Sequence, residues 1–66
     1  TIEDQQNYIL NQLKREKKVK FQDVFLKLEN RIQAIVTFIA LLELLNLQTV
    51  NLVQGEGVNN FWLAAV

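Results

Sequence analysis

The chain has 66 residues, half of them hydrophobic, and its seven basic and seven acidic side chains give a formal net charge of zero. This length allows one small domain, whose core seldom supplies more than about 3–5 kcal/mol of net stability. The chain has neither cysteine nor histidine. Disulfides, thiolate metal sites and the usual general base at neutral pH are therefore excluded.

The remaining ionisable residues do not indicate an enzyme. The carboxylates are scattered over separate predicted elements, and the two glycines flank a single glutamate in a turn instead of forming a phosphate-binding loop. We therefore expect a non-enzymatic domain that holds neither a cofactor nor a metal ion.

The first predicted helix covers residues 2–16. Thr1 is its expected N-cap, and Asp4 stands in the capping-box position three residues later. Apolar residues then recur at helical spacing, namely Ile2, Ile9, Leu10 and Leu13. The basic residues at the end of this segment suit the negative end of a helix dipole.

Two short elements follow the first helix. Residues 19–21 alternate apolar, polar, apolar, which predicts one edge strand of a sheet. A second helix is expected near residues 22–29, because Phe21, Val24, Phe25 and Leu28 follow the helical spacing. Asn30 is the expected N-cap of a third helix.

The third predicted helix, residues 31–46, is apolar over most of its circumference. On a helical wheel its apolar arc spans about 220°, whereas a surface helix needs a stripe of about 100°. Phe38 and Leu42 lie near the middle of that arc, so we assign them to the core. The apolar stretch is shorter than the roughly 20 residues that a membrane span needs, and no contact with a membrane is expected.

After Leu47 the apolar period changes from 3.6 to 2. Residues 49–54 and 61–66 read as two strands, and the intervening loop holds both glycines, which predicts a hairpin. Helix, short strand, helix, helix and hairpin is the element order of a winged helix. The predicted fold is α+β: three helices with a two- to three-stranded antiparallel sheet.

The hairpin strands leave open which residues face the core. If Phe61 and Leu63 point inward with Val50 and Leu52, then Trp62 lies outside with Val53 and Val66. Charge-poor aromatic surface is typical of interfaces, which favours a partner-binding role for Trp62. The other interpretation places Trp62 in the core with Phe61 exposed, or has the first helix cover both.

Charge is distributed unevenly along the chain. All seven Lys and Arg lie between Lys14 and Arg31, and only Glu43 and Glu56 are charged after that point. The basic run from Lys14 to Lys20 either contacts phosphate without sequence preference or forms a solvated helix end. The third helix offers one arginine and Gln33 and is otherwise mostly aliphatic, so it lacks the base-reading residues of a recognition helix.

Three ordered segments carry a resemblance to a known family: VKFQDVF at residues 19–25, TFIALLEL at 37–44 preceded by Arg31, and VNLVQ at 50–54. They resemble the C-terminal winged-helix domain of bacterial segregation and condensation protein A, the kleisin subunit of bacterial condensin. The resemblance covers residues 19–63. The chain departs from it at residues 58–63, VNNFWL, where the family tends to F-G-D-I-x-L, and at Leu47–Gln48, where the family often has glycine.

The resemblance implies a domain that docks onto the ATPase head of a structural maintenance of chromosomes (SMC) protein during chromosome condensation and segregation. Residues 1–66 would be one winged-helix domain, the C-terminal fragment of a longer kleisin that is cytoplasmic and nucleoid-associated. Segregation and condensation protein B would bind other parts of that longer chain. The ATPase chemistry would belong to SMC.

The expected partner surface combines the outer side of the third helix with the open face of the hairpin. These apolar residues occupy positions that are normally polar in a free monomer, and they are Val36, Leu41, Leu44, Val53 and Trp62. We expect no direct DNA binding by this domain. The alternative hypothesis is a DNA-binding winged-helix transcriptional regulator.

Overall fold

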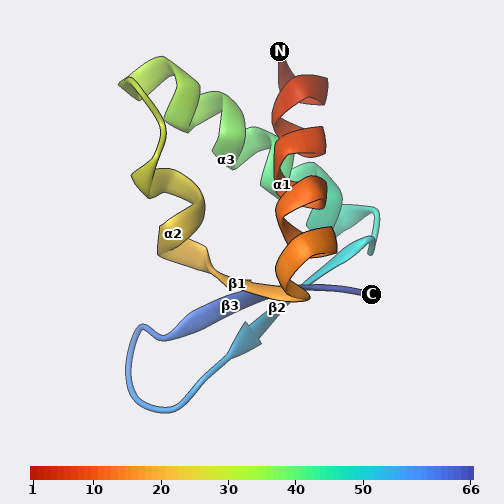
Figure 1. Ribbon diagram of the computed structural model, residues 1–66, viewed down its shortest axis with the longest axis vertical. Helices are drawn as coiled ribbons and strands as arrows, with labels where there is room; N and C mark the ends of the chain where they lie inside the picture. The colour runs from red at the N-terminus through yellow and green to blue at the C-terminus, as the bar shows by residue number, and fades with distance from the viewer.

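Three helices lie above a three-stranded antiparallel sheet in the computed structural model, which describes residues 1–66 (Figure 1). The strand order is β1-β3-β2, so the last strand of the chain is the central one. The α+β fold and the winged-helix order of elements are as predicted. In chain order the elements are α1 (Ile2–Glu16), β1 (Lys18–Lys20), α2 (Phe21–Leu26), α3 (Arg31–Asn46), β2 (Val50–Gln54) and β3 (Phe61–Ala65).

Side-chain caps fix where the two long helices begin. The hydroxyl of Thr1 accepts a hydrogen bond from the backbone of Asp4 at 3.1 Å, and the Asp4 carboxylate accepts one from the amino terminus, which completes a capping box. Hydrogen bonding of the Asp4 carboxylate to the Thr1 side chain first, and then to the charged amino terminus, lowers the pKa of Asp4. Asn30 caps α3 by accepting from the backbone of Gln33 at 2.8 Å. The second helix is shorter than predicted, because α2 ends at Leu26.

Polar and small residues form the contact between α1 and α3. Thr37 is fully buried there; its hydroxyl accepts from Gln5 of α1 at 2.6 Å and donates to the Gln33 carbonyl at 2.7 Å. Ala40 is also fully buried. Their small side chains face the neighbouring helix, and the Thr37 hydroxyl has both of its hydrogen bonds within the protein. This arrangement decides which side of α3 faces inward.

The inward side of α3 is not the one that the helical wheel predicted. Phe38 and Leu42, assigned to the core, are 46% and 49% exposed. Leu41 and Leu44, assigned to the outer side, are 1% and 4% exposed and belong to the core. The wheel failed because apolar residues almost surround the helix, so the centre of their arc does not mark the buried face. The side of α3 that carries Thr37 and Ala40 packs against α1 instead.

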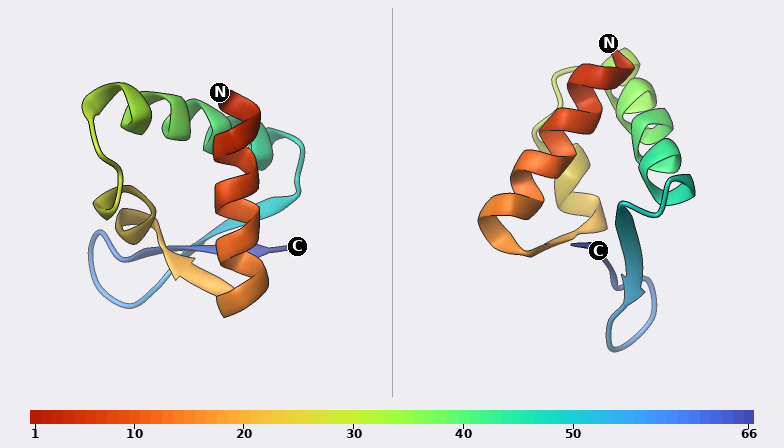
Figure 2. Two further views of the ribbon diagram at one scale, coloured as in Figure 1. Left: turned by 45° about the horizontal axis from the view of Figure 1, so that its top comes forward. Right: turned by 90° about the vertical axis from the view of Figure 1, so that its right-hand side faces the viewer.

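The core joins the helices to the inner face of the sheet. Val50 and Leu63 are buried, whereas Leu52 and Phe61, on the same inner face nearer the β2–β3 loop, are partly exposed. Figure 2 shows that this loop extends away from the helices. The buried apolar residues are Ile9, Leu13, Val19, Val24, Ala40, Leu41, Leu44, Val50 and Leu63. None of the helices combines the length and the hydropathy that a membrane-spanning helix needs.

A Schellman motif ends α3. The amide of Thr49 donates to the Leu44 carbonyl and the amide of Gln48 donates to the Leu45 carbonyl, both at 3.1 Å. Gln48 has a φ of 61°, in the left-handed region that favours glycine. Gln48 therefore occupies the position of a Schellman motif that usually holds glycine, at a cost in backbone strain.

Two neighbouring leucines of α3 give a direct test of its orientation. Leu41→Ala should cost about 2–5 kcal/mol of unfolding free energy because it opens a cavity in the core. Leu42→Ala should cost less than about 1 kcal/mol, since half of that side chain is already exposed. Urea unfolding followed by circular dichroism measures both values. Equal losses, or the reverse order, would show that α3 is rotated differently.

Replacing Gln48 should relieve the strain in the Schellman turn. We expect Gln48→Gly to raise the free energy of unfolding by about 0.5–1 kcal/mol, since glycine has no Cβ to clash at positive φ. Gln48→Val should lower it, because a β-branched side chain tolerates this backbone conformation poorly. Thermal melts of the two variants check the order. A destabilised Gln48→Gly would mean that the side chain contributes a contact.

Candidate protein-binding site

The side of α3 that faces away from α1 is apolar and exposed. Its large side chains recur three or four residues apart, which places them along one face of the helix. They are Ile32, Ile35, Phe38, Ile39 and Leu42. Monomeric proteins seldom keep a continuous apolar face of this kind without a partner.

An apolar groove adjoins this face where α3 meets the sheet. Its volume is about 340 Å³, and every side chain that lines it is hydrophobic. The lining comes from the start of α2, from α3 and from both strands of the hairpin: Phe21, Phe38, Leu41, Leu42, Leu45, Leu52 and Phe61. No ionisable or hydrogen-bonding side chain points into it, so the groove is suited to apolar contact and not to catalysis.

Packing within the domain holds the walls of the groove. The Phe21 ring lies 5.3 Å from that of Phe25, tilted by 53°, a favourable aromatic arrangement. Across the hairpin, Leu52 stands opposite the buried Leu63, and Gln54 stands opposite Phe61. The cross-strand register therefore places Leu52 and Phe61 on the face of the sheet that carries the helices. Both side chains remain partly exposed there, because the helices do not fully cover this end of the sheet.

Trp62 lies on the opposite face of the sheet, as the first of the two interpretations expected. It stands across the hairpin from Val53. The ammonium groups of Lys18 and Lys20 lie 4.7 and 5.6 Å from the centre of its ring. These contacts leave the indole half-buried and place two cations over it.

The five residues expected at the partner surface do not form one patch. Leu41 and Leu44 are buried core residues, which is a correction to the expected surface, although Leu41 also lines the base of the groove. Val36 is partly buried in the first half of α3 and lines a different hollow, together with Gln33, instead of the groove. Val53 and Trp62 are accessible on the outer face of the sheet. Only the last two share a location.

Sequence reasoning missed the residues that do form an apolar surface. As expected, α3 carries more apolar side chains than the core can bury. The helical wheel, however, assigned the exposed ones to the wrong side of the helix. One signal in the sequence could have corrected this: Ala34, Thr37 and Ala40 are small and share a face. Small residues permit close packing of another helix, whereas large ones such as Phe38 and Ile39 can remain outside.

The basic cluster lies at the opposite end of α1 from the capping box. Its members, Lys14, Arg15, Lys17, Lys18 and Lys20, are all exposed. None is ion-paired, since the single ion pair in the structure joins the amino terminus to Asp4. The ammonium groups of Lys18 and Lys20 lie over the Trp62 ring. The exposed face of α3 contributes no cation apart from Arg31 at its start.

Comparison with known proteins assigns the family. The profile of the segregation and condensation protein ScpA matches residues 1–65. The chain belongs to the ScpA family. Segregation and condensation protein A of Clostridium acetobutylicum is 32% identical over 65 residues, which is 98% of this chain and 26% of that protein. Proteins of the same name from the Clostridium botulinum strains Eklund 17B and Alaska E43 are 34% identical over 59 residues, 89% of this chain and 24% of each.

Membership of the ScpA family confirms the resemblance drawn from the three sequence segments. The family is named for chromosome segregation and condensation and not for a reaction, in keeping with a non-enzymatic domain. The chain spans about a quarter of the length of the ScpA relatives it matches. The activities of those whole proteins are therefore considered below as proposals.

The position of the cations predicts the outcome of a DNA-binding assay. We expect no measurable binding of duplex DNA by this chain at physiological salt, because the α3 face is aliphatic and net charge is zero. A gel shift over a range of salt concentrations tests this. A micromolar, salt-sensitive shift that disappears in the Lys17→Glu, Lys18→Glu double variant would contradict it.

Proposed function

We propose that this domain docks onto the ATPase head of an SMC protein through the apolar groove and the adjoining face of α3. The observation that carries the proposal is a wholly hydrophobic groove on a member of the ScpA family. Such a groove has no reactive side chain, so its proposed role is to bind another protein through apolar contacts. ATP hydrolysis belongs to the SMC partner.

The composition of the surface supports a stable interface. Three phenylalanines, Phe21, Phe38 and Phe61, line the groove together with four leucines. Centrally placed aromatic residues commonly dominate binding energy, at about 2 kcal/mol or more each. Charged residues are absent from the groove lining, as is usual at interface centres.

The proposal extends to the place of the chain in a larger assembly. Residues 1–66 are a winged-helix domain and the C-terminal part of a kleisin that joins SMC heads, in the cytoplasm and at the nucleoid. Segregation and condensation protein B binds other parts of that kleisin. The aliphatic exposed face of α3 argues against the alternative of a DNA-binding transcriptional regulator.

Charged substitutions in the groove should weaken capture of an SMC head. We expect Phe38→Glu and Leu42→Glu each to weaken binding at least tenfold, about 1.4 kcal/mol, because each places a charge in an apolar contact. Isothermal titration calorimetry with a purified SMC head measures the affinity, and circular dichroism confirms that each variant is folded. Val58→Glu is the matched control, since Val58 is 86% exposed on the hairpin loop.

Variants on the outer face of the sheet separate two docking modes. Trp62→Ala and Val53→Glu should leave binding within about twofold of wild type, since neither residue lines the groove. Loss of binding in these variants, with normal binding by Phe38→Glu, would move the interface to the outer face. If the wild-type chain binds no SMC head, the docking proposal fails and family membership alone remains.

A further inference from the structure

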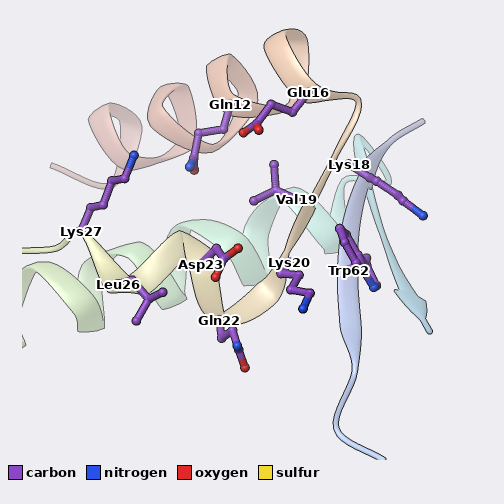
Figure 3. A pocket seen from close by; sticks show the side chains of 10 residues that line it. All are labelled: Gln12, Glu16, Lys18, Val19, Lys20, Gln22, Asp23, Leu26, Lys27 and Trp62. Carbon is purple, nitrogen blue, oxygen red and sulfur yellow. The ribbon is translucent and has the colours of Figure 1, made fainter. Parts of the chain in front are cut away.

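A second cavity lies between the C-terminal half of α1, strand β1 and helix α2, with a volume of about 520 Å³ (Figure 3). It shares no lining residue with the apolar groove. Strand β1 is the edge of the sheet, with β3 on one side only. The cavity differs from the groove in chemistry because most of its lining is polar or charged.

The cavity contains an unsatisfied buried acceptor. Gln12 is only 7% exposed, and its Oε1 atom is buried without any hydrogen-bond partner. In Figure 3 its side chain extends from α1 into the cavity, beside that of Glu16. An unpaired buried polar atom costs about 1–3 kcal/mol, a large fraction of the stability of a domain this small. No group of the chain donates a hydrogen bond to this atom.

Carboxylates approach the same space from two helices. Figure 3 shows Glu16 of α1 and Asp23 of α2 reaching toward the cavity from opposite sides. Neither forms an ion pair with a lysine or arginine of the chain. Lys18 and Lys20 also belong to the lining, but both lie over the Trp62 ring. Next to Gln12, Glu16 and Asp23 therefore supply acceptors, and Lys27 is the one lysine of the lining that does not lie over the Trp62 ring.

We propose that this cavity binds an arginine side chain of a partner protein. The guanidinium would donate to Gln12 Oε1 and to the carboxylates of Glu16 and Asp23, which a planar fork with five N–H groups can satisfy together. Its alkyl stem would lie against Val19 and Leu26, the aliphatic members of the lining. Lysine fits less well, since its ammonium is a compact and strongly hydrated point charge.

One cation of the chain competes for the same position. Lys27 lines the cavity yet makes no ion pair. If Lys27 entered the cavity in solution, an external arginine would be excluded. The site is independent of the groove, so an arginine-binding result stands whether or not the groove docks onto an SMC head.

Titration of the labelled chain with arginine analogues tests the site. We expect N-acetyl-L-arginine N-methylamide to shift the Gln12 side-chain amide resonance and the backbone amides of Glu16 and Asp23 saturably in the millimolar range. The neutral isostere N-acetyl-L-citrulline N-methylamide, at matched ionic strength, should produce at least fivefold weaker binding. Gln12→Leu and Asp23→Asn should each weaken arginine binding at least fivefold, whereas Glu3→Gln, on the exposed first turn of α1, should not.

Two further variants complete the test. Gln12→Leu should raise the melting temperature, because it removes an unsatisfied buried acceptor at similar volume. Lys27→Met should bind arginine as tightly as wild type or more tightly. The proposal is overturned if citrulline binds equally well, if Gln12→Leu binds arginine normally or melts at a lower temperature, or if only Lys27→Met binds.

Discussion

The contact between α1 and α3 at Thr37 and Ala40 determines the rest of the structure. Both side chains are small, and the Thr37 hydroxyl is satisfied by Gln5 and by its own helix. A second link joins Gln6 of α1 to Glu43 of α3 at 2.8 Å. Burying the Thr37 hydroxyl costs little free energy, because the hydroxyl is hydrogen-bonded within the protein. The contact also fixes the rotation of a helix whose own hydrophobicity is nearly uniform.

Two surfaces of different chemistry follow from that rotation. Large apolar side chains of α3 turn outward and meet the start of α2 and the hairpin, which forms a groove without polar groups. The other side of α2 meets α1 and β1 around an unsatisfied glutamine. In the proposed account the groove supplies binding energy through desolvation, and the polar cavity supplies selection for one side-chain type, since polar complementarity mainly contributes specificity.

Local signals in the sequence predicted the fold well and the surface poorly. Thr1 and Asn30 cap the helices as expected. Period-two alternation left two orientations of the hairpin open, and the structure has the favoured one, with Leu63 inward and Trp62 on the opposite face. The orientation of α3 could not be obtained from apolar periodicity, since that pattern has no clear minimum around the helix. The partners that select its buried side, above all Gln5, are distant in sequence and polar. The unsatisfied state of Gln12 likewise depends on tertiary packing alone.

The central claim is that the outward face of α3 is covered when an SMC head binds. Methyl-labelled NMR of the chain, free and with a purified SMC head, measures this residue by residue. The account predicts that the methyl resonances of Ile35, Ile39 and Leu42 shift or broaden on binding, whereas those of the core residues Ile9 and Leu63 change little. Binding that perturbs Val53 and Val66 on the hairpin while leaving the α3 methyls unchanged would contradict it.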